Sequence, residues 1–241
     1  MKKQRIFLMA VMLLTLAMPA VAWAKMPGSI HVKGTGVVLV QPDVAAIHIA
    51  MEEKAPTGEG AQSKNNAAVA AVKKALFDAG IAKDNMVTTY TALSPEYSYE
   101  DNGKRSLMGY RANTTMDVYT DKVDAVGTYI DVAVKAGATR IDNVTFSISD
   151  HSRYYGQALQ MAVKNAEASA KSIAAAYGKP LGQVLEVVEN TGSPAVAQPK
   201  EVMGANFGRT EGTGADATPT QIHYDKIQVF ADLSVVYSLL Q

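Results

Sequence analysis

Residues 29–54, SIHVKGTGVVLVQPDVAAIHIAMEEK, contain the pattern that decides the fold. Two stretches, Ser29–Val40 and Asp43–Lys54, alternate apolar and polar side chains, as half-buried β-strands do. Gln41 and Pro42 separate the stretches, and Pro42 stiffens the chain at this point. The pattern therefore predicts a β-hairpin with one face toward a core and one polar face.

Two glycines lie on the apolar face of this predicted hairpin. If Val40 pairs with Asp43, Gly34 and Gly36 fall among the inward positions of the first strand. A strand position without a side chain either weakens the strand or admits the close approach of another element. We expect a helix or a neighbouring chain to lie directly above these glycines.

The remaining periodicities predict an α+β fold, in which antiparallel sheets of long hairpins pack against helices. A strand-strand-helix unit occurs twice and is followed by a strand, a long helix and two strands. After the first hairpin the predicted elements are a helix over Thr57–Ala79, a hairpin of Met86–Glu100 and Arg105–Thr120, a helix over Asp121–Ala136, a strand over Arg140–Ser149, a helix over His151–Tyr177, and strands over Val184–Glu189 and Ile222–Leu240.

The segment 191–221 differs in composition from the rest of the chain. It is dominated by Gly, Ala, Pro, Thr and Ser and has few large apolar residues. Such a segment does not bury enough surface to order itself. We predict a flexible loop that is either disordered or ordered only by a partner.

The first 24 residues have the organisation of a secretory signal peptide. Lys2, Lys3 and Arg5 precede an apolar run over Ile6–Met18, and the segment ends in small-x-small at Ala22–Ala24. Cleavage after Ala24 would leave a domain of residues 25–241. The apolar run is shorter than the roughly 20 residues of a membrane span, so we expect an exported chain with no integral membrane segment.

Composition narrows the classes of partner. Signal cleavage would leave 20 basic and 23 acidic residues, and no run of Lys and Arg is present to neutralise phosphates, which argues against nucleic acid. The chain has no cysteine. An exported protein without disulfides must rely on packing or on subunit association.

Several short segments in a shared order resemble the SIMPL-domain family, which includes bacterial periplasmic immunogenic proteins. They are Val-Lys-Gly-Thr-Gly at 32–36, Pro-Asp at 42–43, Ala-Gly-Ile at 79–81, Pro-Glu-Tyr-Ser-Tyr at 95–99 and Gly-Tyr-Arg-Ala at 109–112. The resemblance implies a periplasmic α+β protein, often a homo-oligomer, with links to the cell envelope and oxidative stress and without an established enzymatic activity.

Two histidines and one glutamate are candidate metal ligands. In the proposed register His31 lies opposite Glu52, and His48 shares their polar face. A zinc site needs three or four ligands that converge on one point, so these three residues are weak candidates. A solvated strand face with a cross-strand His–Glu pair explains them better, and we predict no metal and no cofactor.

Sequence patterns typical of catalysis are also missing. No Gly-x-Ser-x-Gly elbow is present, and no cysteine can replace a serine nucleophile. The adjacent acids at 52–53 and 100–101 would point to opposite faces of their strands. Gly34 and Gly36 lack the further glycine and the following helix of a dinucleotide loop. We therefore predict that the chain is not an enzyme.

Aromatic residues concentrate on the second predicted hairpin, at Tyr90, Tyr97, Tyr99 and Tyr110. They either pack across strands or form an interface, where tyrosine is enriched. A hairpin of this length would extend beyond the helices that cover it, and exposed strand edges are normally paired or protected. We expect an interface between copies of the chain.

Three functions follow from these observations. The first is a noncatalytic periplasmic protein that self-associates and contributes to envelope integrity or oxidative-stress tolerance. The second is a small-molecule or peptide binding module, with a cleft between the sheet and the Ala-rich helix at 151–177 that residues 191–220 would cover. The third is a metal-dependent enzyme that uses His31, His48 and Glu52.

Overall fold

The computed structural model describes residues 28–99, 105–190, 200–203 and 220–240. Within these ranges the elements are β1 (Ser29–Val40), β2 (Val44–Ala55), α2 (Gly58–Asp78), η1 (Lys83–Asn85), β3 (Met86–Tyr99), β4 (Arg105–Thr120), η2 (Val123–Ala125), α3 (Val126–Lys135), β5 (Arg140–Ser147), α4 (His151–Ala176), β6 (Leu181–Glu189), β7 (Lys200–Met203) and β8 (Ile227–Leu239). The predicted α+β class is confirmed, and the predicted second hairpin forms as β3 and β4. The predicted signal peptide lies outside the described residues.

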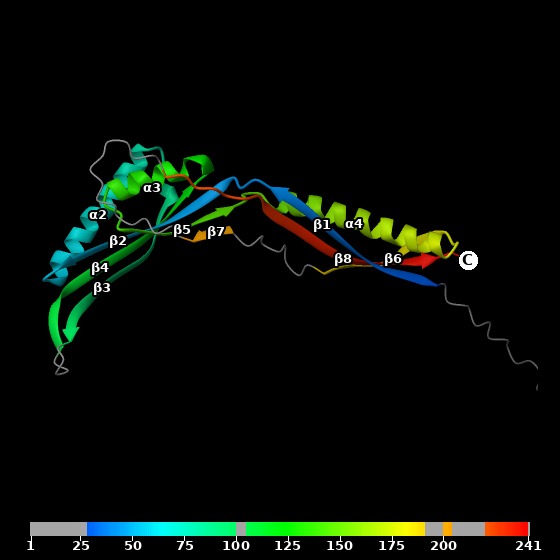
Figure 1. Cartoon of the computed structure of the whole chain (residues 1–241), viewed down its shortest axis with the longest axis horizontal. Helices are drawn as coiled ribbons and strands as arrows, with labels where there is room; N and C mark the ends of the chain where they lie inside the picture. Colours follow the sequence, from blue (N-terminus) through cyan, green and yellow to red (C-terminus); the bar gives the residue numbers. More distant parts are fainter. Residues whose placement is uncertain (1–27, 100–104, 191–199, 204–219, 241) are drawn as a thin grey trace, which may run out of the picture.

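The strands form two antiparallel sheets. One has five strands in the order β3-β4-β2-β5-β7, and the other has three in the order β1-β8-β6. The sheets follow one another along the long axis of the molecule, with α2 and α3 against the first and α4 against the second (Figure 1). The hairpin of β3 and β4 extends beyond the N-terminal end of α2 (Figure 1).

The predicted hairpin of β1 and β2 is wrong. β1 pairs with β8 along its whole length, and β2 pairs with β4 and β5. A two-residue hairpin turn needs a positive φ at its first central position, which Gln41 adopts only at a cost. Residues 41–43 instead carry the chain from one sheet to the other, and the Asp43 amide donates to the Ser147 carbonyl of β5 (3.1 Å).

The alternation within each strand was nevertheless predicted correctly. In β1 the side chains of Ile30 and Val32 are buried while those of His31 and Lys33 are exposed. Alternation fixes which side chains share a face, and it holds whichever strand is the partner.

The five-stranded sheet and the helices α2 and α3 enclose the larger core. Its fully buried side chains include Ile47, Ile49, Met51, Val72, Leu76, Met116, Val118 and Phe146. One polar residue, Asn65 of α2, is completely buried among them. Its amide donates to the Met51 carbonyl (2.7 Å), and its Oδ1 accepts from the Thr114 hydroxyl (2.5 Å). Asn65 thus ties the helix to both β2 and β4.

Small residues bring α4 very close to β1. A stripe of alanines in α4 is buried against the three-stranded sheet: Ala158, Ala162, Ala166, Ala170 and Ala174. A Cβ added at Gly34 would overlap the carbonyl oxygen of Ala162, and one at Gly36 would overlap that of Ala158. The expected close approach above these two glycines is confirmed, and the approaching element is a helix of the same chain.

Part of the predicted loop 191–221 is described. Residues 200–203 form β7, which pairs antiparallel with β5 and which sequence reasoning did not predict. Residues 191–199 and 204–219 lie outside the described residues, so flexibility of this loop stays a prediction.

Candidate functional site

The distal half of the β3–β4 hairpin carries an apolar stripe that begins beside the first residue of α2 and continues beyond the helix. The stripe consists of Leu93, Tyr97, Tyr99 and Leu107, all of which are exposed. We call these four residues the tip stripe. In the register, Tyr97 lies opposite Leu107 and Leu93 lies opposite the buried Ala112. Because alternate residues share a face, the tip stripe continues the core-facing side of the sheet beyond the helix.

The start of α2 marks the boundary between covered and uncovered sheet. A Cβ at Gly58, the first residue of α2, would lie 3.5 Å from the Tyr110 ring and 3.3 Å from Leu93. Tyr110 is therefore half-buried beneath the helix start, whereas Tyr99 is 72% exposed. Tyr97 is covered on one side by the Arg105 guanidinium, 3.3 Å from its ring centroid, in a cation–π contact.

A bulge changes the course of β4 next to the tip stripe. Glu96 pairs with Gly109, and the following residue, Tyr97, pairs with Leu107, so Met108 is the extra residue. Met108 is 70% exposed. A Cβ at Gly109 would come within 2.7 Å of the Ala55 carbonyl oxygen, so a residue without a side chain is required where β4 passes the end of β2.

The structure brings only some of the predicted tyrosines together. Tyr97 and Tyr99 share the tip stripe, and Tyr110 lies on the same face at its covered end. Tyr90 is exposed but has the opposite parity along β3, so it lies on the other face of the sheet. Sequence reasoning missed Leu107 and Met108, although two adjacent large apolar residues beside a polar loop were a usable signal.

A charged network on the opposite face fixes the base of the hairpin. The Glu96 carboxylate accepts hydrogen bonds from Lys54 (2.9 Å) and Arg111, and the Arg111 Nε lies 3.4 Å from Glu52. These hydrogen bonds, that of Lys54 above all, hold the pKa of Glu96 below its usual range. The hydrogen bond to Glu96 raises the pKa of Arg111. The network connects β2, β3 and β4 where the tip begins.

Replacing Glu96 with glutamine is expected to lower the free energy of unfolding at neutral pH and to have less effect in acid. A carboxylate with a lowered pKa in the fold contributes stability above its unfolded pKa, and this contribution disappears as pH falls through the folded pKa. Urea denaturation at neutral pH and at about pH 3 measures the difference. Glu53→Gln is the matched control, because Glu53 makes no ion pair with any residue that the structure describes. If the difference in the free energy of unfolding between the wild type and Glu96→Gln is the same at both pH values, the Glu96 carboxylate does not stabilise the fold through its charge.

The three candidate metal ligands are not assembled. His31 lies in β1, where its ring is 3.2 Å from the Ser29 hydroxyl, while His48 and Glu52 lie in the other sheet. The predicted register that put His31 opposite Glu52 is wrong because β1 pairs with β8. His48 Nδ1 is 2.7 Å from Asp117 Oδ1. No cluster of three or more metal-ligating side chains occurs in the described ranges.

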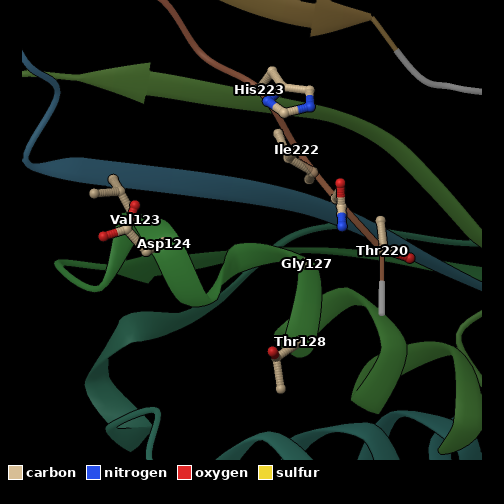
Figure 2. Close-up of a pocket in the computed structure, with 8 residues that line it drawn as sticks. Val123, Asp124, Gly127, Thr128, Thr220, Ile222 and His223 are labelled. Carbon is tan, nitrogen blue, oxygen red and sulfur yellow. The ribbon is translucent and has the colours of Figure 1, made fainter. Parts of the chain in front are cut away.

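A shallow cavity lies where residues 220–223 cross α3 (Figure 2). Its volume is about 310 Å³, and its lining residues are Val123, Asp124, Gly127, Thr128, Thr220, Gln221, Ile222 and His223. Thr220 is held by the Asp131 carboxylate through its amide (3.1 Å) and its hydroxyl (2.6 Å). Asp124 accepts from the Tyr224 hydroxyl (2.6 Å). Asp131 and Asp124 thus anchor the C-terminal segment through Thr220 and Tyr224, and His223 is the other ionisable residue of the lining.

The predicted cleft between the sheet and the Ala-rich helix is also wrong. The alanine stripe of α4 is in contact with the backbone of β1, and no space for a ligand is left between Gly34 and Ala162. Small side chains were expected to allow close approach, and here the backbone of α4 packs directly against the backbone of β1 at Gly34 and Gly36. Where α4 crosses β1 there is thus no room for the ligand of the binding-module hypothesis, and most of the predicted roof of that cleft, 191–220, lies outside the described residues.

These features define a two-sheet α+β protein whose most distinctive surface is an exposed apolar hairpin. The chain shares 31% identity over 216 residues with uncharacterized protein YggE of Edwardsiella ictaluri, covering 88% of this chain and 90% of the relative. It shares 30% identity over 172 residues with the 26 kDa periplasmic immunogenic protein of Brucella melitensis, covering 70% and 69%. The family signature described as SIMPL, protein of unknown function (DUF541), matches residues 30–237. The chain belongs to the SIMPL family.

No helix in the described part of the chain combines the length and the apolar character that a bilayer crossing demands.

Proposed function

We propose that this chain is an exported, noncatalytic periplasmic protein that self-associates through the tip of its β3–β4 hairpin. The assembly contributes to envelope integrity or to tolerance of oxidative stress. Support for export comes from the signal-peptide pattern of residues 1–24 and from the printed name of the Brucella relative, which calls that protein periplasmic.

The tip stripe carries the proposal. It continues the core-facing side of a sheet past the helix that covers that side, so four large apolar side chains are left in solvent. Contiguous exposed apolar surface on a water-soluble protein marks an interaction site. Tyrosine suits such a surface because its ring is apolar while its hydroxyl tolerates partial hydration. A second copy that covers the tip stripe would shield it from water, as α2 shields the apolar face of the rest of the sheet.

The contacts of the ionisable side chains support the noncatalytic part of the proposal. The carboxylates and cations of the hairpin base are paired with one another, and those beside the cavity anchor Thr220 and Tyr224. Catalysis requires a reactive group, a base and an orienting partner around one point. The described residues do not present this arrangement.

Light scattering on the processed wild-type protein at micromolar concentration is expected to give a mass above that of one chain. The triple variant Tyr97→Ser/Tyr99→Ser/Leu107→Ser should shift the protein toward monomer. Central interface side chains cost about 2 kcal/mol or more each on truncation, which raises the dissociation constant by more than about tenfold per residue.

Tyr177→Ser is the matched control for the triple variant. Tyr177 is 74% exposed but follows α4, on the other sheet, so its loss should leave the mass unchanged. A monomeric wild-type protein would overturn self-association. If the wild type associates, restoring the triple variant to a deletion strain and challenging the cells with peroxide and detergent tests the physiological role. Full protection by a monomeric, exported variant would show that the role does not need assembly.

A further inference from the structure

β6 is an edge strand that α4 contacts only at its two ends, where Leu181 packs against the core and the Tyr155 hydroxyl donates to Glu189. It lies at the end of the three-stranded sheet, and α4 is placed over β1 and β8 rather than over β6. Four large apolar side chains of β6 are each about half exposed: Val184, Leu185, Val187 and Val188. An apolar strand with a free edge is a template for pairing with another strand.

The backbone of β6 presents hydrogen-bonding groups on its free side. Residues 186–189 lie opposite residues 236–233 of β8, and the Asn190 amide donates to the Asp232 carbonyl of β8 (2.9 Å). Asn190, and with it Val188 and Glu186, therefore directs its backbone groups toward β8. In an antiparallel pair, alternate residues direct both their N–H and C=O groups toward the partner. The N–H and C=O groups of Val187 and Glu189 therefore point away from β8.

The other sheet edges in the described residues are protected. α4 lies over β1, and Asn165 donates to the outward-pointing Thr35 carbonyl (2.8 Å). β3 contains Pro95, which has no N–H to donate, and one of its two register shifts lies directly beside that proline. The two register shifts of β6 lie before Glu186, so residues 186–190 continue without interruption. β7 is only four residues long. β6 has nine residues, and none of them is Lys, Arg or Pro, the residues that commonly block edge pairing.

We infer that β6 pairs antiparallel with β6 of a second copy about a two-fold axis at Val188. This inference rests on the proposed self-association and assigns it a second contact. The axis puts Val188 opposite Val188 of the partner, Val187 opposite Glu189, and Glu186 opposite Asn190. Val187 and Glu189 are the residues whose backbone groups point outward, so they form the hydrogen-bonded pairs.

Charge favours this register. Both charged residues of β6, Glu186 and Glu189, are acidic, and like charges directly opposite each other destabilise a strand pair. With the axis at Val188 neither carboxylate faces another. The same surface patch is used on both copies, as a two-fold interface requires. The result is a continuous six-stranded sheet with α4 of each copy on one side.

The absence of cysteine from the chain makes the contact directly testable. Residues at a two-fold axis between antiparallel strands have Cα atoms about 4.5 Å apart when the pair is not hydrogen-bonded, within the range that a disulfide spans. Val188→Cys is therefore expected to give mostly disulfide-linked dimer under mild oxidation. Leu185→Cys, on the same strand and similarly exposed, lies about 20 Å from its counterpart at roughly 3.3 Å per residue and should remain largely monomeric on a non-reducing gel.

Val187→Pro provides a second measurement, because the Val187 N–H points away from β8 and its loss spares the fold. This variant should keep the wild-type circular dichroism and give a lower mass than the wild type by light scattering, because only the hairpin contact is left. If the wild type associates but the two cysteine variants cross-link equally, or neither cross-links, the β6 contact is contradicted. The hairpin proposal would then remain in place. Efficient cross-linking of Val188→Cys, together with a triple hairpin variant whose mass equals that of the wild type, would support the β6 contact and contradict the hairpin contact. A monomeric wild type would overturn both.

Discussion

Gly34→Ala is expected to destabilise the protein by about 3 kcal/mol or more, a large part of the total stability of about 5–15 kcal/mol that a domain has. The added methyl group would overlap the Ala162 carbonyl oxygen and lie 2.8 Å from the Ala166 Cβ. Both atoms belong to the body of α4, so no side-chain rotation relieves the overlap. The helix must move away from β1, and contacts along the whole alanine stripe are then weakened. Urea denaturation followed by circular dichroism measures the loss.

Gly156→Ala is the matched control for this substitution. Gly156 lies within α4, and a Cβ there would have no neighbour within 4 Å. Alanine in an open helical position is favoured over glycine by up to about 1 kcal/mol. The same chemical change is therefore expected to stabilise at one position and destabilise at the other. A Gly34→Ala variant as stable as wild type would show that α4 and β1 are not held at the observed spacing.

Asn65→Leu is expected to cost about 2–4 kcal/mol, because each buried group left without a hydrogen-bond partner costs about 1–3 kcal/mol. The leucine has a similar size but leaves the Met51 carbonyl without the amide donor and the Thr114 hydroxyl without its acceptor. Asn66→Leu tests whether the effect comes from burial. The Asn66 Oδ1 accepts a hydrogen bond from the Gln62 amide at the surface (2.9 Å), so this substitution should change stability by no more than about 0.5 kcal/mol.

A double-mutant cycle with Thr114→Val separates the hydrogen bond from the loss of packing. If the Thr114 hydroxyl and Asn65 Oδ1 act as a pair, the two substitutions should be less than additive by about 1–2 kcal/mol, within the range found for residues in contact. Additive effects would mean that the two side chains contribute independently.

Local pattern was enough to predict most elements of this fold but not their partners. The 3.6-residue spacing of α2 and α4 and the two-residue alternation of β1 and β2 record which side chains are buried. Alternation holds no information about which strand lies alongside. The prediction failed at Gln41 and Pro42, where proximity in sequence was taken as pairing although this dipeptide does not suit a two-residue hairpin turn.

The candidate surfaces were predictable to a similar degree. Tyr97 and Tyr99 were found because aromatic residues cluster beside a loop. Tyr90 belongs to the same aromatic concentration, but an even-numbered and an odd-numbered residue of one uninterrupted strand segment lie on opposite faces. Grouping by composition did not use this alternation. The exposure of β6 was missed, since Val184–Glu189 reads as an ordinary core strand. Only the placement of α4 over β1 leaves it open.

The pairing of β1 with β8 also sets the order in which the molecule can be built. Ser29 meets Ser238, so the first and last strands of the domain are neighbours. Contacts between such distant parts of a chain form slowly because a very long loop must close first. As the polypeptide is synthesised, β1 has no strand to pair with until nearly all of the domain has followed. A C-terminal truncation that removes β8 should therefore leave the first strand and its helix without a sheet, and make the chain dependent on chaperones that bind unfolded protein.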